Sequence, residues 1–189
     1  MSTRPIPATP SASEPPGGFE LRPVRAEELV EVGRLTAEVY VGDGFVDATD
    51  EYVDPGDDYA TELTDAAGRA REAEVLVAVE DGQLLGTVTF CPVGSAYREI
   101  GRDDEGEFRM LAVSPAARGR GVGRALVEHC LGRARELGYA GIRMSSMDRM
   151  TSAHRVYERL GFVRAPQDDW SPVPGVNLLA YYASLVPPE

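Results

Sequence analysis

The stretch RGRGVGR, residues 118–124, places three glycines and three arginines between a strand-like run and a run with helical spacing. Glycine lacks a Cβ atom, so it leaves backbone N–H groups accessible to a ligand and tolerates unusual φ angles. The first turn of a helix leaves about four N–H groups unpaired and carries about half a positive charge. A strand, this loop and a helix N-terminus therefore predict a site for phosphate oxygens.

The spacing of the loop distinguishes between phosphate-binding patterns. A Walker loop needs Gly-Lys followed by Ser or Thr, and the glycines of this loop are not followed by that sequence. The dinucleotide pattern G-x-G-x-x-G does not fit either, because glycine occupies every second position. The pattern R-x-x-G-x-G over 118–123 instead resembles the acyl-CoA pyrophosphate loop of the GNAT superfamily of N-acetyltransferases.

Two longer segments carry the same resemblance. LAVSPAARGRGVGRALVEHCLGRARELGY (111–139) is similar to the strand, loop and helix of that family, and AHRVYERLGF (153–162) is similar to its second signature. The resemblance extends less sharply from residue 19 to the end of the chain. It implies one GNAT domain over 19–189, acetyl-CoA as cosubstrate, and transfer of the acyl group to a primary amine of a small molecule or peptide. The transfer would proceed by direct attack in a ternary complex.

Hydrophobic periodicity predicts an α/β fold independently. Apolar residues at helical spacing predict helices over 26–40, 58–71, 122–137 and 151–160. Runs rich in β-branched and aromatic residues predict strands over 19–24, 74–80, 83–91, 107–113, 141–146, 162–165 and 176–185. Asp81-Gly82 suits the tight turn of a hairpin, and Pro23 suits an edge strand. We expect a mixed sheet of about six or seven strands with helices on both faces.

The resemblance also implies where the cofactor binds. In the family, the strand before the loop splays away from its parallel neighbour, and the pantetheine arm lies in the gap. The backbone of Leu111, Ala112 and Val113 would pair with pantetheine, although an ordinary core strand is the alternative for these residues. The pyrophosphate would be held by Arg118, Gly119, Arg120, Gly121, Val122, Gly123 and Arg124.

Two side chains are candidates for proton transfer. Tyr157 matches the family tyrosine that protonates the departing thiolate or orients the thioester, and a phenol can do so only if it is positioned and tuned. Glu107 begins the splayed strand, where family members often place a carboxylate base for the acceptor ammonium. The alternatives are a packed helix tyrosine for Tyr157, and for Glu107 a solvated carboxylate or an ion pair with Arg109 on the same strand face.

One position departs from the family pattern. Many members carry asparagine three residues before the alanine matched by Ala153, and this chain has Met150 there. Ser152 and His154 are the candidates to replace that contact, and an exposed helix histidine is the alternative for His154. The segment 41–60 is acidic and contains no Lys or Arg, so it would attract a cationic amine if it lined a cleft. A solvated loop is the alternative for this segment.

Composition excludes several classes of function. Nineteen Lys and Arg against 31 Asp and Glu give a net charge of −12, which argues against a nucleic-acid or anionic-membrane surface and against RNA binding through RGRGVGR. Two cysteines, Cys91 and Cys130, and two histidines leave little material for a metal site, and we expect free buried thiols in a reducing cytoplasm. No apolar run approaches the roughly 18 residues that span a bilayer. Residues 1–18 lack a signal-peptide core and are expected to be a disordered tail.

Two further questions stay open at this point. The apolar C-terminal strand would be compatible with a homodimer. A non-catalytic acyl-CoA-binding module on the same fold is the alternative to an enzyme, because a fold alone does not define an activity.

Overall fold

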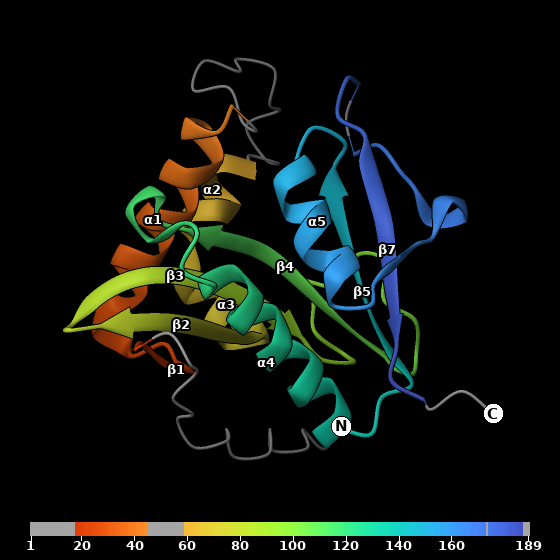
Figure 1. Cartoon of the computed structure of the whole chain (residues 1–189), viewed down its shortest axis with the longest axis horizontal. Coiled ribbons are helices and arrows are strands. Elements are labelled where there is room, and N and C mark those ends of the chain that lie inside the picture. The colour runs from red at the N-terminus through yellow and green to blue at the C-terminus, as the bar shows by residue number, and fades with distance from the viewer. Residues whose placement is uncertain (1–17, 45–58, 173, 187–189) are drawn as a thin grey trace.

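The computed structural model describes residues 18–44, 59–172 and 174–186. They form a mixed seven-stranded sheet in the order β1-β2-β3-β4-β5-β7-β6, with helices packed against it (Figure 1). The predicted α/β class is therefore confirmed. The predicted tail lies outside the described residues apart from Gly18, as does the central part of the acidic segment, residues 45–58.

The described residues form strands, helices and short 3₁₀ turns. The strands are β1 (Glu20–Pro23), β2 (Glu74–Glu80), β3 (Gln83–Cys91), β4 (Glu105–Val113), β5 (Gly141–Met147), β6 (Val163–Arg164) and β7 (Leu178–Ser184). The helices are α1 (Leu29–Gly42), α2 (Tyr59–Thr64), α3 (Ala66–Glu72), α4 (Val122–Glu136) and α5 (Thr151–Arg159). Short 3₁₀ turns occupy Ala26–Glu28, Pro115–Ala117 and Pro166–Asp168.

The helix predicted over 58–71 is wrong as a single element. Asp65 leaves the helical conformation, with φ −79° and ψ 62°, and its carboxylate accepts the backbone N–H of Gly68 at 2.7 Å. This N-cap starts α3 and separates it from α2. The buried guanidinium of Arg69 then donates to the carbonyls of Glu62 and Leu63, both at 2.8 Å, and so satisfies the end of α2.

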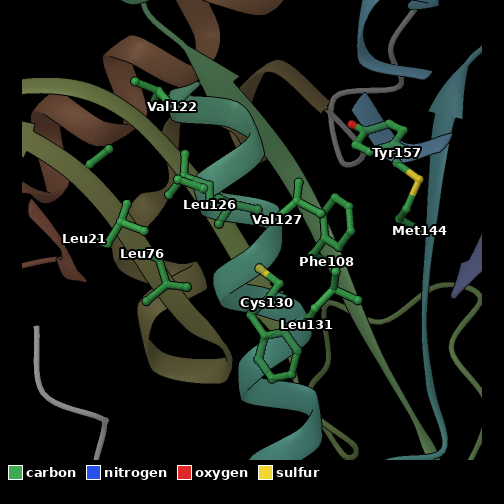
Figure 2. Close-up of a cluster of buried hydrophobic side chains, with 14 of the residues drawn as sticks. Leu21, Leu76, Phe108, Val122, Leu126, Val127, Cys130, Leu131, Met144 and Tyr157 are labelled. Carbon is green, nitrogen blue, oxygen red and sulfur yellow. The ribbon is translucent and has the colours of Figure 1, made fainter. Parts of the chain in front are cut away.

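The sheet separates two main hydrophobic layers. On one face α4 packs against the sheet through a cluster that includes Phe90, Phe108, Leu126, Val127 and Cys130 (Figure 2). A second cluster joins α1 and α2 to β4 and includes Leu35, Val39, Leu63, Met110 and Ala112. Strand β4 contributes to both clusters, so its backbone is fixed from both faces.

Strands β4 and β5 are parallel neighbours over only three residue pairs, from Glu105 opposite Gly141 to Glu107 opposite Arg143. Beyond this point β5 continues along β7 while β4 continues along β3, and the two strands diverge (Figure 1). The closed end is held by the buried ion pair between Arg143 and Glu105, and Arg143 also contacts Asp168 at 2.5 Å. The predicted splay of the strand before the glycine loop is therefore confirmed.

Candidate active site

The glycine loop adopts a conformation that requires glycine at two positions. Gly119 and Gly121 have φ angles of 77° and 82°, in the left-handed region that side chains with a Cβ atom disfavour. Gly121 is the N-cap of α4 and provides no side-chain cap, so the first N–H groups of the helix have no partner from that residue. A Cβ atom built at either glycine would meet no protein atom within 4 Å. The mouth of α4 is thus open on the side where a phosphate would approach.

The three arginines of the loop are paired with carboxylates at its edge. Arg118 Nη2 lies 2.8 Å from Asp43 Oδ2 at the end of α1, and Arg120 Nη2 lies 2.5 Å from Glu80 Oε1 at the end of β2. Arg124 pairs with Glu128 at 2.9 Å within α4. Each guanidinium has five N–H donors, so these pairs leave donors available, but a bound anion would compete with the carboxylates.

The part of β4 that faces the gap contains a bulge. Thr89 lies opposite Arg109 and Thr87 opposite Ala112, so two residues of β4, Met110 and Leu111, correspond to one residue of β3. Met110 has φ 54°, a conformation that costs a methionine about 1–3 kcal/mol. Among the described strand residues, β4 has no ladder partner on the β5 side after Glu107. The backbone of Leu111, Ala112 and Val113 therefore borders the gap.

Tyr157 is placed beside this gap by α5. Its ring centroid lies 5.8 Å from that of Phe108 on β4, and 6.0 Å from those of Phe162 and Tyr181. Figure 2 shows the ring next to Phe108 and Met144. Burial raises the pKa of the Tyr157 hydroxyl, and the nearby Tyr40 hydroxyl raises it further. The packing of the ring fits a structural tyrosine, and its position at the gap fits the catalytic role. The catalytic role of Tyr157 therefore stays a prediction.

Glu107 is neither solvated nor paired with Arg109. Its side chain is fully buried, and its carboxylate accepts the backbone N–H groups of Glu99 at 3.0 Å, Ile100 at 3.0 Å and Gly101 at 2.8 Å. Both structural alternatives for this residue are therefore wrong. Its proposed role as the base remains a prediction that now has to account for these three bonds.

Arg109 instead holds two other carboxylates on the same face of β4. Its Nη2 lies 2.6 Å from Glu99 Oε1, and its Nη1 lies 3.2 Å from Glu62 Oε1 and donates to the carbonyl of Tyr97 at 3.0 Å. Burial raises the pKa of the Glu99 carboxyl to about 7, Arg109 opposes the rise, and the charges of Glu107 and Glu62 add to it. A carboxyl group of this kind is half ionised near neutral pH.

Glu99 and Tyr40 are site residues that the sequence did not indicate. Glu99 lies in the connection between β3 and β4, which carries no motif and reads only as a polar loop. Tyr40 occupies an ordinary apolar position of α1, where burial raises its pKa to about 12, and its ring lies 6.3 Å from that of Tyr59 on α2. Glu99 is identified by its ion pair with Arg109, and Tyr40 by its electrostatic effect on Tyr157, which lies far from it in the chain.

The position of the missing family asparagine is occupied by a packed contact. Ser146 on β5 donates to the sulfur of Met150 at 3.3 Å, and its oxygen lies 3.2 Å from Nε2 of His154. His154 is buried beside Tyr181, so an exposed helix histidine is wrong, and burial lowers its pKa. Ser152 is exposed on α5.

Several expectations concern what the site lacks. Cys91 and Cys130 are free and buried, and burial raises the pKa of Cys91 to about 12, so neither suits a nucleophile. Within residues 18–44, 59–172 and 174–186 there is no group of three or more His, Cys, Asp or Glu arranged to hold a metal ion. The same residues include no helix with the length and apolar character of a membrane span.

A glycine loop at a helix N-terminus, beside a splayed pair of strands, is the arrangement expected of an acyl-CoA-dependent N-acyltransferase. Residues 43–162 match the model of the acetyltransferase (GNAT) family, and the chain belongs to this family. The resemblance to the GNAT superfamily is thereby confirmed.

Individual relatives agree with this assignment. A mycothiol acetyltransferase of Cellulomonas flavigena is 36% identical over 120 residues, which cover 56% of this chain and 33% of the relative. The chain thus spans about a third of the length of the curated relatives that it matches.

Solved structures show the same fold at low sequence identity. A GNAT acetyltransferase of Staphylococcus aureus Mu50 superposes with a TM-score of 0.68 at 14% identity, covering 89% of this chain and 99% of that one. The yncA protein of Salmonella typhimurium, solved with its cofactor acetyl-CoA, superposes with a TM-score of 0.63 at 19% identity, covering 90% and 96%.

Proposed function

We propose that the chain is an acetyl-CoA-dependent N-acetyltransferase that acylates a primary amine of a small molecule or peptide. The observation that carries the proposal is the open gap between β4 and β5 directly before the glycine loop of α4. Membership of the GNAT family supports it, as does the acetyl-CoA bound in a protein of the same fold.

The glycine loop supplies the anchor for the cofactor. The N–H groups at the start of α4 and the glycines Gly119, Gly121 and Gly123 surround the pyrophosphate, with Val122 opening the helix. Arg118, Arg120 and Arg124 add charge-assisted donors once phosphate replaces their carboxylate partners. Pantetheine then follows the free backbone edge of Val113, Ala112 and Leu111 toward Met110.

The acceptor amine attacks the thioester directly. The C–N bond forms, the tetrahedral intermediate collapses, and the C–S bond breaks to release the thiolate of coenzyme A. Tyr157 stands beside the gap on α5 and donates its proton to this thiolate, and the proton that the amine nitrogen loses during collapse restores the phenol. The raised pKa of Tyr157 keeps the hydroxyl protonated but makes the phenol a weaker acid, so its donation has to be coupled to the proton that the amine loses. The free, buried cysteines fit a reducing cytoplasm as the proposed location.

The experiment follows thiol release from acetyl-CoA over a panel of primary amines. The parent chain and Tyr157→Phe are compared with the matched control Tyr182→Phe, which removes a hydroxyl on β7 that donates to Ala140. We expect a loss of about 10²-fold in kcat for Tyr157→Phe, with unchanged binding of coenzyme A, and a near-parental rate for the control. Cofactor binding without transfer to any amine would contradict an enzyme and would favour a non-catalytic acyl-CoA-binding module.

A further inference from the structure

We propose that Glu99, and not Glu107, takes the proton from the ammonium group of the acceptor, and that Glu107 acts by holding Glu99 in position. This inference rests on the proposed function, because it assigns a residue to the acceptor side of that reaction. It identifies the acceptor as a protonated primary amine that approaches β4 from the side of α1 and α2.

The position of the thioester follows from the direction of the cofactor. With the pyrophosphate at the mouth of α4 and pantetheine along Val113 to Leu111, the next backbone positions of β4 are Met110 and Arg109. The acyl group therefore lies near the bulge. The side chain of Arg109 projects there, and Glu99 and Glu62 are bound to it at 2.6 and 3.2 Å.

Glu107 is poorly placed to receive a proton. Its carboxylate is fully buried and already accepts three backbone N–H groups, from Glu99, Ile100 and Gly101. Protonation would weaken these bonds, because a charged carboxylate accepts hydrogen bonds more strongly than a neutral carboxyl group. The same bonds fix the turn that carries Glu99, which makes Glu107 a positioning residue.

Glu99 has what a base needs at this place. Its side chain is 27% exposed, so a proton received there can pass to solvent. Its protonation would not leave a buried cation alone, because Arg109 keeps Glu62 as a partner. Burial and the two neighbouring carboxylates set its pKa to about 7, close to the pH at which a base works best.

The groups that face Glu99 come from every element around it. The carboxylates raise its pKa and Arg109 lowers it, whereas the tyrosines and Cys91 stay neutral near pH 7 because burial raises their own pKa values. These groups are Arg109 and Glu107 on β4, Glu62 and Tyr59 on α2, Tyr40 on α1 and Cys91 on β3.

The proton balance of the full reaction is then closed. The ammonium gives one proton to Glu99 and becomes a nucleophilic amine. The amine forms the C–N bond, and its second proton is passed on when the C–S bond breaks and the thiolate is protonated through Tyr157. Glu99 releases its proton to solvent, so each turnover yields the amide, coenzyme A and one proton.

The test is the pH dependence of kcat for the full chain at saturating acetyl-CoA. The acceptor is the best of phenethylamine, spermidine, L-lysine and Gly-Gly, and the variants are Glu99→Gln and Glu107→Gln. The matched control is Glu136→Gln, the same change in an exposed carboxylate that pairs with Arg133 at the end of α4. Binding of coenzyme A and the melting temperature confirm that each variant is folded.

The two glutamate variants have different expected outcomes. In the parent, kcat falls as the pH is lowered, and the midpoint of this fall lies at about pH 7. Glu99→Gln lowers kcat at pH 7 by about 10²-fold or more and abolishes this midpoint. Glu107→Gln keeps the midpoint but moves it to lower pH, because it removes a charge that raises the pKa of Glu99. Glu99→Asp retains the acidic limb at a reduced rate.

Failure of this inference differs from failure of the proposed function. If the parent acetylates an amine and Glu99→Gln keeps its rate and its midpoint, the assignment of Glu99 is overturned and the function stands. The assignment is also overturned if Glu107→Gln abolishes the midpoint while Glu99→Gln only shifts it. A parent that binds acetyl-CoA but acylates no amine in the panel overturns both.

Discussion

The arginine pairs at the glycine loop give a prediction about cofactor affinity in which removing a contact strengthens binding. In the proposed site, a phosphate of coenzyme A competes with Asp43 for Arg118 and with Glu80 for Arg120. Asp43→Asn and Glu80→Gln remove these competitors and also remove negative charge beside the entering phosphates. Both variants should therefore bind coenzyme A more tightly than the parent.

The size of the effect follows from the exposure of the Arg118 pair. The side chains of Arg118 and Asp43 are 46% and 28% exposed, and an ion pair in such a setting contributes at most about 1 kcal/mol. Because about 1.4 kcal/mol corresponds to a tenfold change, Asp43→Asn should tighten binding by up to about fivefold. Asp43 is also the C-cap of α1, where a negative charge opposes the helix dipole, so the variant should lose almost no stability.

The assay is isothermal titration of the apo chain with coenzyme A at low and high ionic strength. The gain in affinity should shrink at high salt, because exposed charges are then screened. The control is Glu136→Gln, which removes a similar surface charge far from the loop and should leave the dissociation constant unchanged. If Asp43→Asn and Glu80→Gln bind coenzyme A no more tightly than the parent at low salt, the phosphates do not displace Asp43 and Glu80 from these arginines, and the proposed exchange is wrong.

Two further predictions concern the loop and Glu99. Gly121→Ala forces a left-handed φ of 82° on a residue with a Cβ atom, so it should lower the free energy of unfolding by about 1–2 kcal/mol in urea titrations. The same variant should also weaken the binding of coenzyme A. The control is Gly132→Ala inside α4, where a Cβ atom would meet no protein atom within 4 Å, and this variant should cause neither loss. The carboxyl of Glu99 has a pKa of about 7 in the fold against 4.5 for a free side chain, so the folded chain binds the extra proton. Its contribution to stability is therefore present below pH 4.5 and is lost as the pH rises to 7. Relative to the parent, Glu99→Gln should gain about 2–3 kcal/mol in unfolding free energy between pH 4.5 and 7.5, and a difference independent of pH would show that Glu99 titrates normally.

The sequence predicts those parts of the fold that depend on one local physical cause. The left-handed glycines of the loop, the Asp-Gly hairpin turn and the apolar stripe of α4 each depend on nearby residues alone, and the structure agrees with them. The break between α2 and α3 was missed because the apolar spacing continues through Asp65. The cap of α3 depends on the carboxylate of Asp65 reaching the N–H of Gly68. The break also exposes carbonyls at the end of α2, and Arg69 has to donate to them.

The chemistry of the acceptor side was not accessible in the same way. Sequence position placed the base at Glu107, because the start of the splayed strand is where such a carboxylate occurs in the family. A carboxylate can act as the base only if its oxygens are free to accept a proton. The oxygens of Glu107 already accept hydrogen bonds from the backbone N–H groups of the turn 99–101. That turn has no sequence signature, yet it brings Glu99 to Arg109 and leaves it partly exposed. The family pattern therefore indicates the strand at which we propose the reaction, whereas our assignment of the base depends on the fold of a loop.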